Sequence, residues 1–334
     1  EKKLKRLGFK TKILEFKEKG FKPVKNLYAR FGSKSPNFCY AGHLDVVPPG
    51  DIKDWTTSPF RPSIKRGHLI GRGANDMKSS IAAFVSAVSK FLSKNKKFNG
   101  SISLLITGDE EGDAVNGTKK VVEFLRKKRE KINFCLVGEP TNPNVLGEMI
   151  KIGRRGSLTG KLIIFGLQGH VAYPSRANNP STTIVNILKE LKEIKFDKGT
   201  KDFQPTNLEV TKININNTAD NVIPATAEAT FNIRFNNKHS SNSLKKKLNK
   251  IFRKMTKKHK SKFKIEYRVS GEAFLTKPNK TTFMIQNIIK KITKLKPKLS
   301  TTGGTSDLRF IRTICPGLEF GLVGKTMHKV DEAV

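Results

Sequence analysis

The residues best suited to carry out a reaction are a histidine and several carboxylates that follow apolar runs of the sequence. His43 and Asp45 end one such run. Glu110 and Glu111 follow a second run, and Glu139 follows a third. Imidazole nitrogens and carboxylate oxygens suit Zn²⁺ or a similar divalent ion. Such an ion polarises a carbonyl and lowers the pKa of water, while a carboxylate that does not bind it can move a proton. The pattern therefore predicts metal-assisted amide hydrolysis.

Each of these residues also has an ordinary structural explanation. Asp76 precedes a predicted helix and could be its N-cap. Glu110 and Glu111 could form a solvated turn, His43 could be a satisfied core histidine, and Glu139 could be a loop acid. These separate explanations are less convincing when taken together. The chain has only 28 Asp and Glu residues, yet the acidic residues named here fall at equivalent strand ends. The residues alone leave open which of Glu110 and Glu111 is a base and which is a ligand.

The elements that must position these residues form an alternating pattern. Short apolar runs bounded by Gly or Pro are typical of buried strands, at residues 37–47, 101–107 and 132–137. Apolar side chains recur at helical spacing over residues 77–92, and a second helix is predicted over 114–128. Alternating strands and helices predict an α/β domain with a mixed, mostly parallel sheet. Ligands bind beyond the carboxyl ends of such strands, where the histidine and the carboxylates fall.

From Gly156 the pattern changes to that of a second domain. Its predicted elements, in order, are a strand at 158–165, a helix at 180–194, strands at 207–215 and 225–235, a helix at 240–257 and a strand at 262–269. The order β-α-β-β-α-β is that of the ferredoxin-like motif. We therefore predict a domain of residues 1–155 and 270–334, with an inserted ferredoxin-like domain of residues 156–269. The first domain includes a further helix at 281–295.

The chain is strongly basic, with a formal net charge of +37 from 65 Lys and Arg against 28 Asp and Glu. Such an excess could indicate binding to nucleic acid or to a membrane surface. The lysines, however, are spread along the whole chain, and the aromatic residues are mostly Phe in core-like positions. We therefore expect no nucleic-acid partner and no membrane association. A positive field would still attract an anionic small-molecule substrate.

The three cysteines, Cys39, Cys135 and Cys315, stand far apart in apolar stretches. They form no CxxC pair, so a zinc ribbon or a disulfide framework is not expected. The pattern predicts buried free thiols. A reducing cytoplasm is the compartment that fits such a chain best.

Five segments in register resemble the metal motifs of the M20 metallopeptidase family: residues 42–48, 71–78, 109–112, 138–141 and 327–332. Segments 154–160, 169–174 and 302–307 are similar to those of one biosynthetic amidohydrolase of this family. The resemblance covers essentially the whole chain and implies a two-domain M20-type fold whose inserted domain forms a homodimer. It leaves open another deacylase of the family, such as an acetylornithine deacetylase, and a metal-free relative that only binds.

The resemblance implies a role for each matching metal position. His43 and Glu139 would bind one zinc ion. Glu111 and His328 would bind a second, and Asp76 would bridge the two. Each subunit would then hold two Zn²⁺ ions, with Co²⁺ as a substitute in one or both sites.

The resemblance also implies catalytic roles for three residues that are not ligands. Glu110 would be the general base and proton shuttle. Asp45 would hydrogen-bond and orient His43, as carboxylates often do for ligating histidines. His170 would reach the active site of the partner subunit and stabilise the tetrahedral oxyanion. The alternative for His170 is an ordinary surface-loop histidine.

A further set of residues resembles the family's substrate contacts: Arg155, Asn221, Arg234, Thr302, Gly303 and Gly304. Arginine can grip a carboxylate with two hydrogen bonds. For Arg234 the alternative is a solvated strand residue. Turn or surface roles are open for Arg155 and for the Thr-Gly-Gly segment.

Two departures from the family pattern stand out. Leu308 follows Asp307 where the family has Gly, so we expect the substrate loop to differ there. The chain also starts at Glu1 and stops at Val334, soon after His328. The family has an additional N-terminal segment and a C-terminal helix, so we expect both ends to be trimmed.

Overall fold

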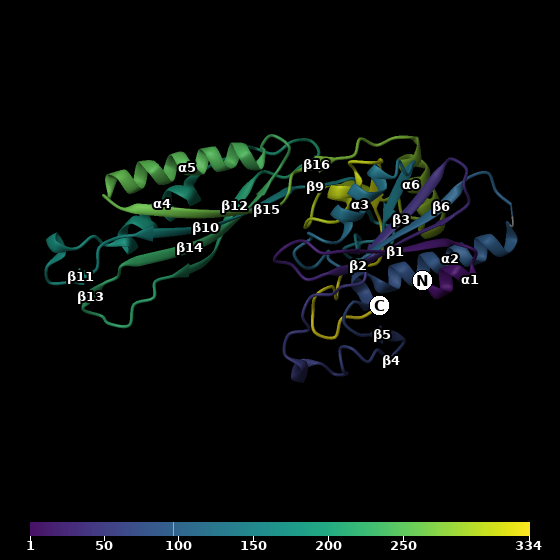
Figure 1. The fold of residues 1–334 in the computed structure, drawn as a ribbon, viewed down its shortest axis with the longest axis horizontal. Coiled ribbons are helices and arrows are strands. Elements are labelled where there is room, and N and C mark those ends of the chain that lie inside the picture. Colours follow the sequence, from purple (N-terminus) through teal and green to yellow (C-terminus); the bar gives the residue numbers. More distant parts are fainter. Residues whose placement is uncertain (96) are drawn as a thin grey trace. The chain divides into compact units, whose positions relative to one another are not determined.

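The computed structural model describes residues 1–95 and 97–334 of the chain. The chain divides into two compact units (Figure 1). Unit 1 comprises Glu1–Ile152, Thr276–Ser300 and Ser306–Val334, and unit 2 comprises Gly153–Leu275 and Thr301–Thr305. Among the described helices none is long and apolar enough to span a membrane.

Unit 1 is built on a mixed sheet of eight strands in the order β1-β2-β6-β3-β7-β18-β8-β17. The middle of the sheet is parallel, because β3 runs parallel to β6 and β7, and β7 runs parallel to β18. This confirms the predicted mixed, mostly parallel sheet. The bounds are β1 (Lys10–Phe16), β2 (Val24–Phe31), β3 (Asn37–His43), β6 (Ser101–Thr107), β7 (Phe134–Val137), β8 (Met149–Lys151), β17 (Lys298–Ser300) and β18 (Gly317–Glu319).

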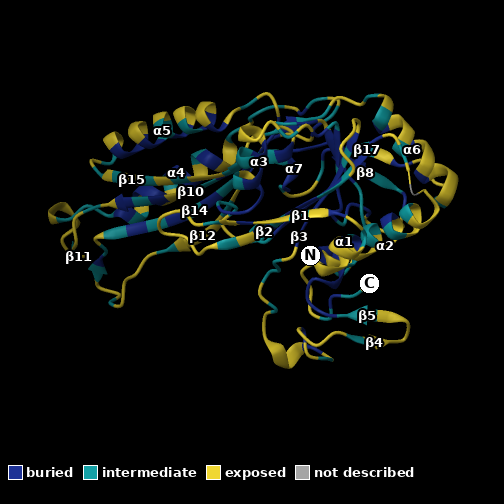
Figure 2. Ribbon diagram, turned by 45° about the vertical axis from the view of Figure 1, so that its right-hand side comes forward, coloured by how far each residue is buried: buried dark blue, intermediate teal, exposed yellow. Residues whose placement is uncertain are grey.

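Unit 1 also contains helices and a separate two-stranded sheet formed by β4 and β5. One core cluster joins Leu104 and Ile106 of the sheet to Val88 of α2. Figure 2 shows the central strands of the sheet buried, whereas the edge strand β1 and the outward face of α6 are largely exposed. The bounds are α1 (Lys2–Arg6), α2 (Ser79–Lys94), α3 (Thr118–Lys127), α6 (Lys280–Thr293), α7 (Leu308–Ile311), β4 (Ser63–Lys65) and β5 (His68–Ile70).

Helix α2 begins two residues later than the pattern predicted. A separate tight turn covers Ala74–Lys78, and within it Asp76 and Met77 have non-helical backbone angles. The N-cap of α2 is therefore Lys78, and the explanation of Asp76 as a helix N-cap is wrong. The Asp76 carboxylate is left available for contacts with residues far away in the sequence.

The predicted helix over 114–128 is also shorter, because α3 begins at Thr118. Its missing first turn is folded around Asp109, whose Oδ2 accepts the N–H groups of Val115 (2.7 Å) and Asn116 (2.8 Å). Ala114 has a φ of 56°, which a helix cannot accommodate.

Unit 2 contains a four-stranded antiparallel sheet in the order β12-β14-β10-β15. Helices α4 and α5 cover one face of it (Figure 1). The chain order β10-α4-β12-β14-α5-β15 confirms the predicted ferredoxin-like motif. The bounds are β9 (Gly153–Arg154), β10 (Gly156–Phe165), β11 (Gly169–His170), α4 (Pro180–Glu193), β12 (Asn207–Asn214), β13 (Val222–Ile223), β14 (Thr226–Phe235), α5 (Ser241–Lys258), β15 (Lys262–Gly271) and β16 (Phe274–Leu275).

The core of unit 2 follows the alternation along β14, in which every second residue is buried. Phe231 and Phe235 are fully buried, and burying each contributes about 1.5–3 kcal/mol. Their rings lie against Gly160 and Gly156 of β10, where a Cβ atom would come within 2.3 Å and 2.2 Å of ring carbons. Glycine is therefore required opposite each ring.

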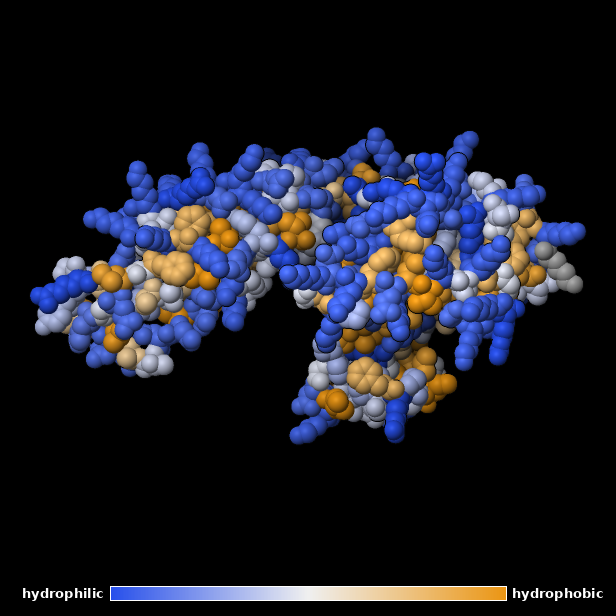
Figure 3. Space-filling view, viewed as in Figure 1, coloured by the Kyte–Doolittle hydropathy of each residue, from blue (hydrophilic) through white to orange (hydrophobic). Residues whose placement is uncertain are grey.

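The three cysteines lie in the environment that the sequence predicted. Cys39, Cys135 and Cys315 are buried and free. On the face shown in Figure 3, hydrophilic side chains are spread over both units and not gathered in one patch.

Candidate metal centre

Five predicted metal ligands converge in unit 1 from five separate segments. His43 is the last residue of β3, Glu111 follows β6, and Glu139 follows β7. These strands are parallel neighbours, so their carboxyl ends meet at one edge of the sheet. Asp76 comes from the turn before α2, and His328 comes from the segment after β18.

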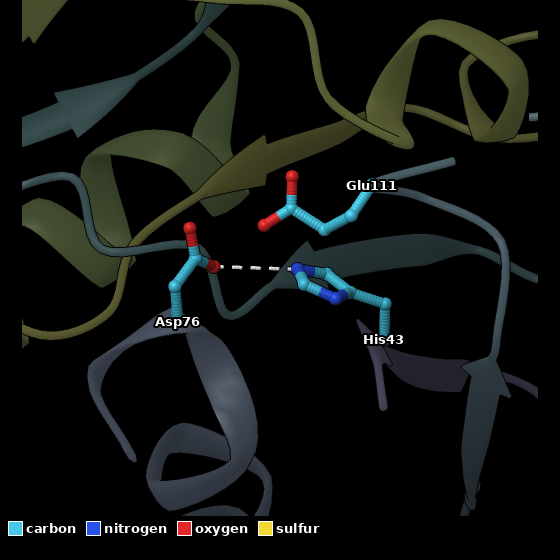
Figure 4. A group of neighbouring side chains, drawn as sticks. All are labelled: His43, Asp76 and Glu111. Atoms are coloured by element: carbon cyan, nitrogen blue, oxygen red, sulfur yellow. Dashed lines mark hydrogen bonds and ion pairs between the residues drawn. The ribbon is translucent and has the colours of Figure 1, made fainter. Parts of the chain in front are cut away.

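The Asp76 carboxylate lies between the two histidines. Its Oδ1 is 3.3 Å from Nε2 of His43, and its Oδ2 is 3.2 Å from Nε2 of His328. His328 Nε2 is also 2.8 Å from Oε1 of Glu111, and His43 Nε2 is 4.0 Å from Oε1 of Glu139. One ligand atom from each of His43, Asp76 and Glu111 lies within 4.8 Å of the others, and Figure 4 shows the Glu111 carboxylate and the His43 ring directed toward Asp76.

The histidines and Asp76 strongly perturb one another. Burial alone would lower the pKa of His43, but hydrogen bonds with Asp45 and Asp76 raise it overall. Burial would raise the pKa of Asp76, but hydrogen bonds with His328 and His43 lower it to about 2. Contacts with Asp76 and Glu111 raise the pKa of His328 to about 10.

The two remaining carboxylates of the centre are held in an unfavourable environment. Burial and the negative charge of Asp307 raise the pKa of Glu110 to about 8. Burial, with the charges of Glu110 and Asp76, raises the pKa of Glu139 well above its usual value. A buried set of like charges is costly unless a counter-charge is present. The set of nitrogen and oxygen donors therefore fits divalent cations.

Asp45 contacts both His43 and the Glu111 segment. Nδ1 of His43 is 3.0 Å from the backbone carbonyl oxygen of Asp45 and 3.5 Å from its carboxylate Oδ1. The other carboxylate oxygen accepts the N–H of Glu111 at 2.9 Å. The nearest acceptor to the His43 ring is thus the backbone of Asp45, and the carboxylate also fixes the position of Glu111.

The remaining predicted site residues lie in unit 2. His170 in β11 is exposed and pairs with Val222 of β13. Asn221 is brought beside it, because the Asn221 carbonyl accepts the N–H of Val171 at 3.0 Å. The pairing of β11 with β13 therefore places His170 and Asn221 together.

Two predicted arginines lie beside each other in the same unit. Burial and the positive charge of Arg234 both lower the pKa of Arg155. Nη1 of Arg155 donates to Oδ1 of Asn207 at 2.8 Å, and Asn207 pairs with Arg234 across β12 and β14. Two neighbouring guanidinium groups suit an anionic ligand, because each can form paired hydrogen bonds with a carboxylate.

The Thr-Gly-Gly loop belongs to unit 2, although the chain on both sides of it belongs to unit 1. Nη1 of Arg154 donates to the Thr302 carbonyl at 3.3 Å. Gly303 has a φ of +101°, a conformation that other residues rarely adopt. Gly304 is exposed.

Residues 39–334 match the family described as peptidase family M20/M25/M40. The chain belongs to this family. The M20 resemblance of the sequence motifs is thereby confirmed, including the two-domain α/β fold.

The relatives of this M20 chain include enzymes and metal-binding peptidases. It is similar to a protein named succinyl-diaminopimelate desuccinylase from Pelagibacter ubique (strain HTCC1062), with 77% identity over 333 residues that cover 100% of this chain and 87% of that protein. A structure of an M20 family metallo-carboxypeptidase from Sulfolobus solfataricus has a TM-score of 0.78 at 19% identity, covering 100% of this chain and 88% of the other. A dinuclear metal binding M20 peptidase from Bacillus subtilis has a TM-score of 0.65 at 13% identity, covering 96% and 80%.

Around Glu110, the M20 chain contains residues that the sequence reasoning missed. Nη1 of Arg309 lies 3.6 Å from Oε1 of Glu110, and both side chains are largely buried. Asp307 is anchored next to them, because its Oδ2 accepts hydrogen bonds from Thr107 (3.1 Å) and Thr118 (2.5 Å). The available signal was the position of Arg309, two residues beyond the 302–307 motif.

Leu308, which departs from the family pattern, is fully buried. It is the first residue of α7, and its Cδ1 lies close to Gly317 of β18. The larger side chain therefore packs into the interior of unit 1, whereas the loop that was expected to change belongs to unit 2.

Proposed function

We propose that this M20 chain hydrolyses N-succinyl-LL-2,6-diaminopimelate to succinate and LL-2,6-diaminopimelate. The observation that carries the proposal is the 77% identity, along the whole chain, to a protein named for this reaction. The convergence of two histidines and several carboxylates at one edge of the sheet supports a hydrolytic site. Such a reaction serves the synthesis of lysine and of diaminopimelate.

We assign two divalent ions, with Zn²⁺ as the first choice and Co²⁺ as a substitute, to the converging ligands. His43 and Glu139 would hold one ion, Glu111 and His328 the other, and Asp76 both. The placement of one Asp76 oxygen toward each histidine supports this division. When bound, the ions supply Lewis acidity and lower the pKa of water.

Glu110 is assigned the proton transfers. Its carboxylate accepts a proton from the attacking water, whose oxygen bonds to the amide carbon. As the carbon–nitrogen bond breaks, the same carboxyl group donates the proton to the leaving amine. Arg309 supports this assignment, because its guanidinium lies beside the Glu110 carboxylate. Asp45 orients His43 and holds the backbone of Glu111.

Substrate carboxylates are assigned to the basic residues of unit 2. Arg155 and Arg234 would bind them through paired hydrogen bonds. The Thr302–Gly304 loop lies beside Arg154, whose Nη1 donates to the Thr302 carbonyl. A substrate with several carboxylates matches two neighbouring guanidinium groups better than a substrate with one.

A homodimer follows if Asn221 and Arg234 contact the same substrate. Asn221 precedes β14 and Arg234 lies near its end. This strand has ten residues, or about 30 Å at 3.3 Å per residue. Figure 1 likewise shows β13 at the opposite end of the unit 2 sheet from β9. We infer that His170 and Asn221 complete the site of a second subunit, where His170 stabilises the oxyanion.

The test is steady-state hydrolysis of N-succinyl-LL-2,6-diaminopimelate by the Zn²⁺-loaded dimer. We expect turnover of this substrate and much weaker turnover of N-acetylornithine. The reverse preference would favour an acetylornithine deacetylase, and absence of turnover by a metal-loaded dimer would contradict the proposal. We place the enzyme in the cytoplasm, since three buried free thiols suit a reducing compartment.

A further inference from the structure

Glu332 is a fully buried carboxylate at the edge of the metal centre. Its Oε1 accepts the N–H groups of Asn75 (2.9 Å) and Asp76 (2.8 Å). Its Oε2 accepts the N–H of Gly73 (3.1 Å) and Nη1 of Arg72 (2.8 Å). One side chain therefore satisfies several donors of the turn that carries Asp76, and the hydrogen bonds are of the strong, charge-assisted kind.

The turn is built so that its N–H groups point at this carboxylate. Gly73 has a φ of 81°, and Asp76 departs from helical angles. Successive backbone N–H groups in such turns form a concave site for an anion. In this protein the anion is Glu332, so the conformation that presents the Asp76 carboxylate depends on a residue far away in the sequence.

Glu332 also lies in the segment that carries His328. The Glu332 carbonyl accepts the N–H of Gly71 at 2.9 Å, and the neighbouring Ala333 carbonyl accepts Nδ2 of Asn75 at 3.2 Å. His328, four positions earlier in the chain, reaches Oδ2 of Asp76 at 3.2 Å. The contacts around Glu332 thus join the segment that carries Asp76 to the segment that carries His328.

Arg72 connects a third ligand-bearing segment to Glu332. Its Nη2 donates to the carbonyls of Pro48 (3.4 Å) and Pro49 (3.3 Å), in the loop that follows His43 and Asp45. Its guanidinium also stacks on Trp55, 5.0 Å from the ring. The Arg72–Glu332 pair is almost completely buried.

We propose that Glu332, paired with Arg72, is a positioning residue that holds the Asp76, His328 and His43 segments in the arrangement that binds metal. The inference rests on the proposed metal-dependent function. A carboxylate is needed because both of its oxygens face donors. Glutamine would present an NH₂ group to one of the two donor sets and leave those groups unpaired.

The test is titration of metal-free protein with Zn²⁺ by calorimetry, for the wild type, Glu332→Gln and a control. We expect Glu332→Gln to weaken binding of at least one ion by about 10-fold to 100-fold, the range for residues that orient metal ligands. The matched control is Glu130→Gln, which removes a carboxylate that binds Arg30 and Tyr28 elsewhere in unit 1. We expect it to lower thermal stability and to leave Zn²⁺ affinity unchanged.

A second, milder variant distinguishes loss of positioning from misfolding of Glu332→Gln. Arg72→Gln keeps the Glu332 carboxylate on the backbone N–H groups and removes only the guanidinium, so we expect a smaller, several-fold loss of affinity. Wild-type affinity in both folded variants would overturn the positioning role. If the wild-type protein itself binds no Zn²⁺, the proposed metal-dependent function is contradicted. This outcome differs from wild-type affinity in the two variants, which would contradict only the positioning role.

Discussion

The two units carry their candidate functional residues in opposite ways. In unit 1 the residues are mainly acidic, buried or half-buried except for the exposed His328, and drawn from five segments to one point. In unit 2 none of them is acidic, they are more exposed, and they lie apart, with the arginine pair separate from His170 and Asn221. We propose that unit 1 binds the divalent cations and that unit 2 supplies positive charge for an anionic substrate.

The physical cost of each arrangement also differs. Burial and repulsion from neighbouring carboxylates raise the pKa values of Glu110 and Glu139. A bound cation would therefore stabilise the ionised carboxylates of unit 1. In unit 2, burial lowers the pKa values of Arg155 and Arg234. A bound anion would therefore stabilise the charged form of both arginines. Each unit thus favours a ligand of the charge opposite to its own.

The largest effect is expected from removing the proton shuttle of unit 1. Glu110→Gln should lower kcat by about 10²–10⁴-fold, because the amide cannot accept or donate the proton. Zn²⁺ binding, measured by metal analysis, should stay at the wild-type ratio, since Glu110 is not an assigned ligand. The control is Glu123→Gln on α3, which removes a half-exposed carboxylate beside Lys120. Wild-type kcat in a metal-loaded Glu110→Gln variant would contradict the assignment.

The next effect tests whether unit 2 serves a second subunit. His170→Ala should lower kcat by about 10²–10³-fold through loss of oxyanion stabilisation. In mixed dimers of Glu110→Gln and His170→Ala chains, one site would combine an intact Glu110 with an intact His170. We therefore expect purified mixed dimers to show about half of the wild-type activity. Inactive mixed dimers would place His170 in the site of its own subunit.

A smaller effect is expected at the arginine pair. Arg234→Ala should raise KM by roughly 10-fold to 100-fold, the equivalent of losing a charged hydrogen bond. The metal content should not change. Arg268→Ala, on the exposed side of β15, is the control for a general loss of charge. A loss of kcat at unchanged KM would show that Arg234 does not bind the substrate in its ground state.

The smallest effect concerns the stability of unit 2 itself. Asp197 accepts hydrogen bonds from the N–H groups of Gly199 and Thr206, and from Nδ2 of Asn236. Although burial opposes it, these bonds lower the pKa of Asp197 to about 2. The stabilisation is therefore full above the ordinary pKa of an Asp, near 4, and is lost as the pH falls toward 2.

Asp197→Asn should therefore cost roughly 1–3 kcal/mol of stability near neutral pH. Denaturant unfolding followed at pH 7 and pH 3 should show the difference between variant and wild type shrinking at the lower pH. Glu193→Gln, at the exposed end of α4, is the control. An equal difference at both pH values would assign the loss to packing.

Much of the fold was predictable because the apolar pattern is local. Strand β6 begins and ends where its apolar run does, and the alternation along β14 identifies its buried face. The boundaries that failed are those fixed by distant partners. The run from residue 37 continues to 47, but β3 ends at His43, where the chain turns to place the side chains of the metal centre.

The candidate ligands were predictable from residue type and from motifs in register. The residues that contact and position the site, such as Arg309 and Glu332, were not. Apart from the position of Arg309 next to the 302–307 motif, nothing local indicates that Arg309 lies beside Glu110, or that Glu332 accepts hydrogen bonds from the turn before α2. Both contacts join residues separated by about 200 positions or more. Periodicity carries no information about such pairs.

The sequence by itself determined which residues could do chemistry, since the types of His43, Asp76, Glu111 and their partners define the donor set. It also determined the order of helices and strands, because these depend on short-range patterns. Only the tertiary structure decided that the donors converge, because convergence depends on how parallel strands are ordered in the sheet. It alone showed the Arg72–Glu332 pair, since the conformation of one turn is held there by a charge from the opposite end of the chain.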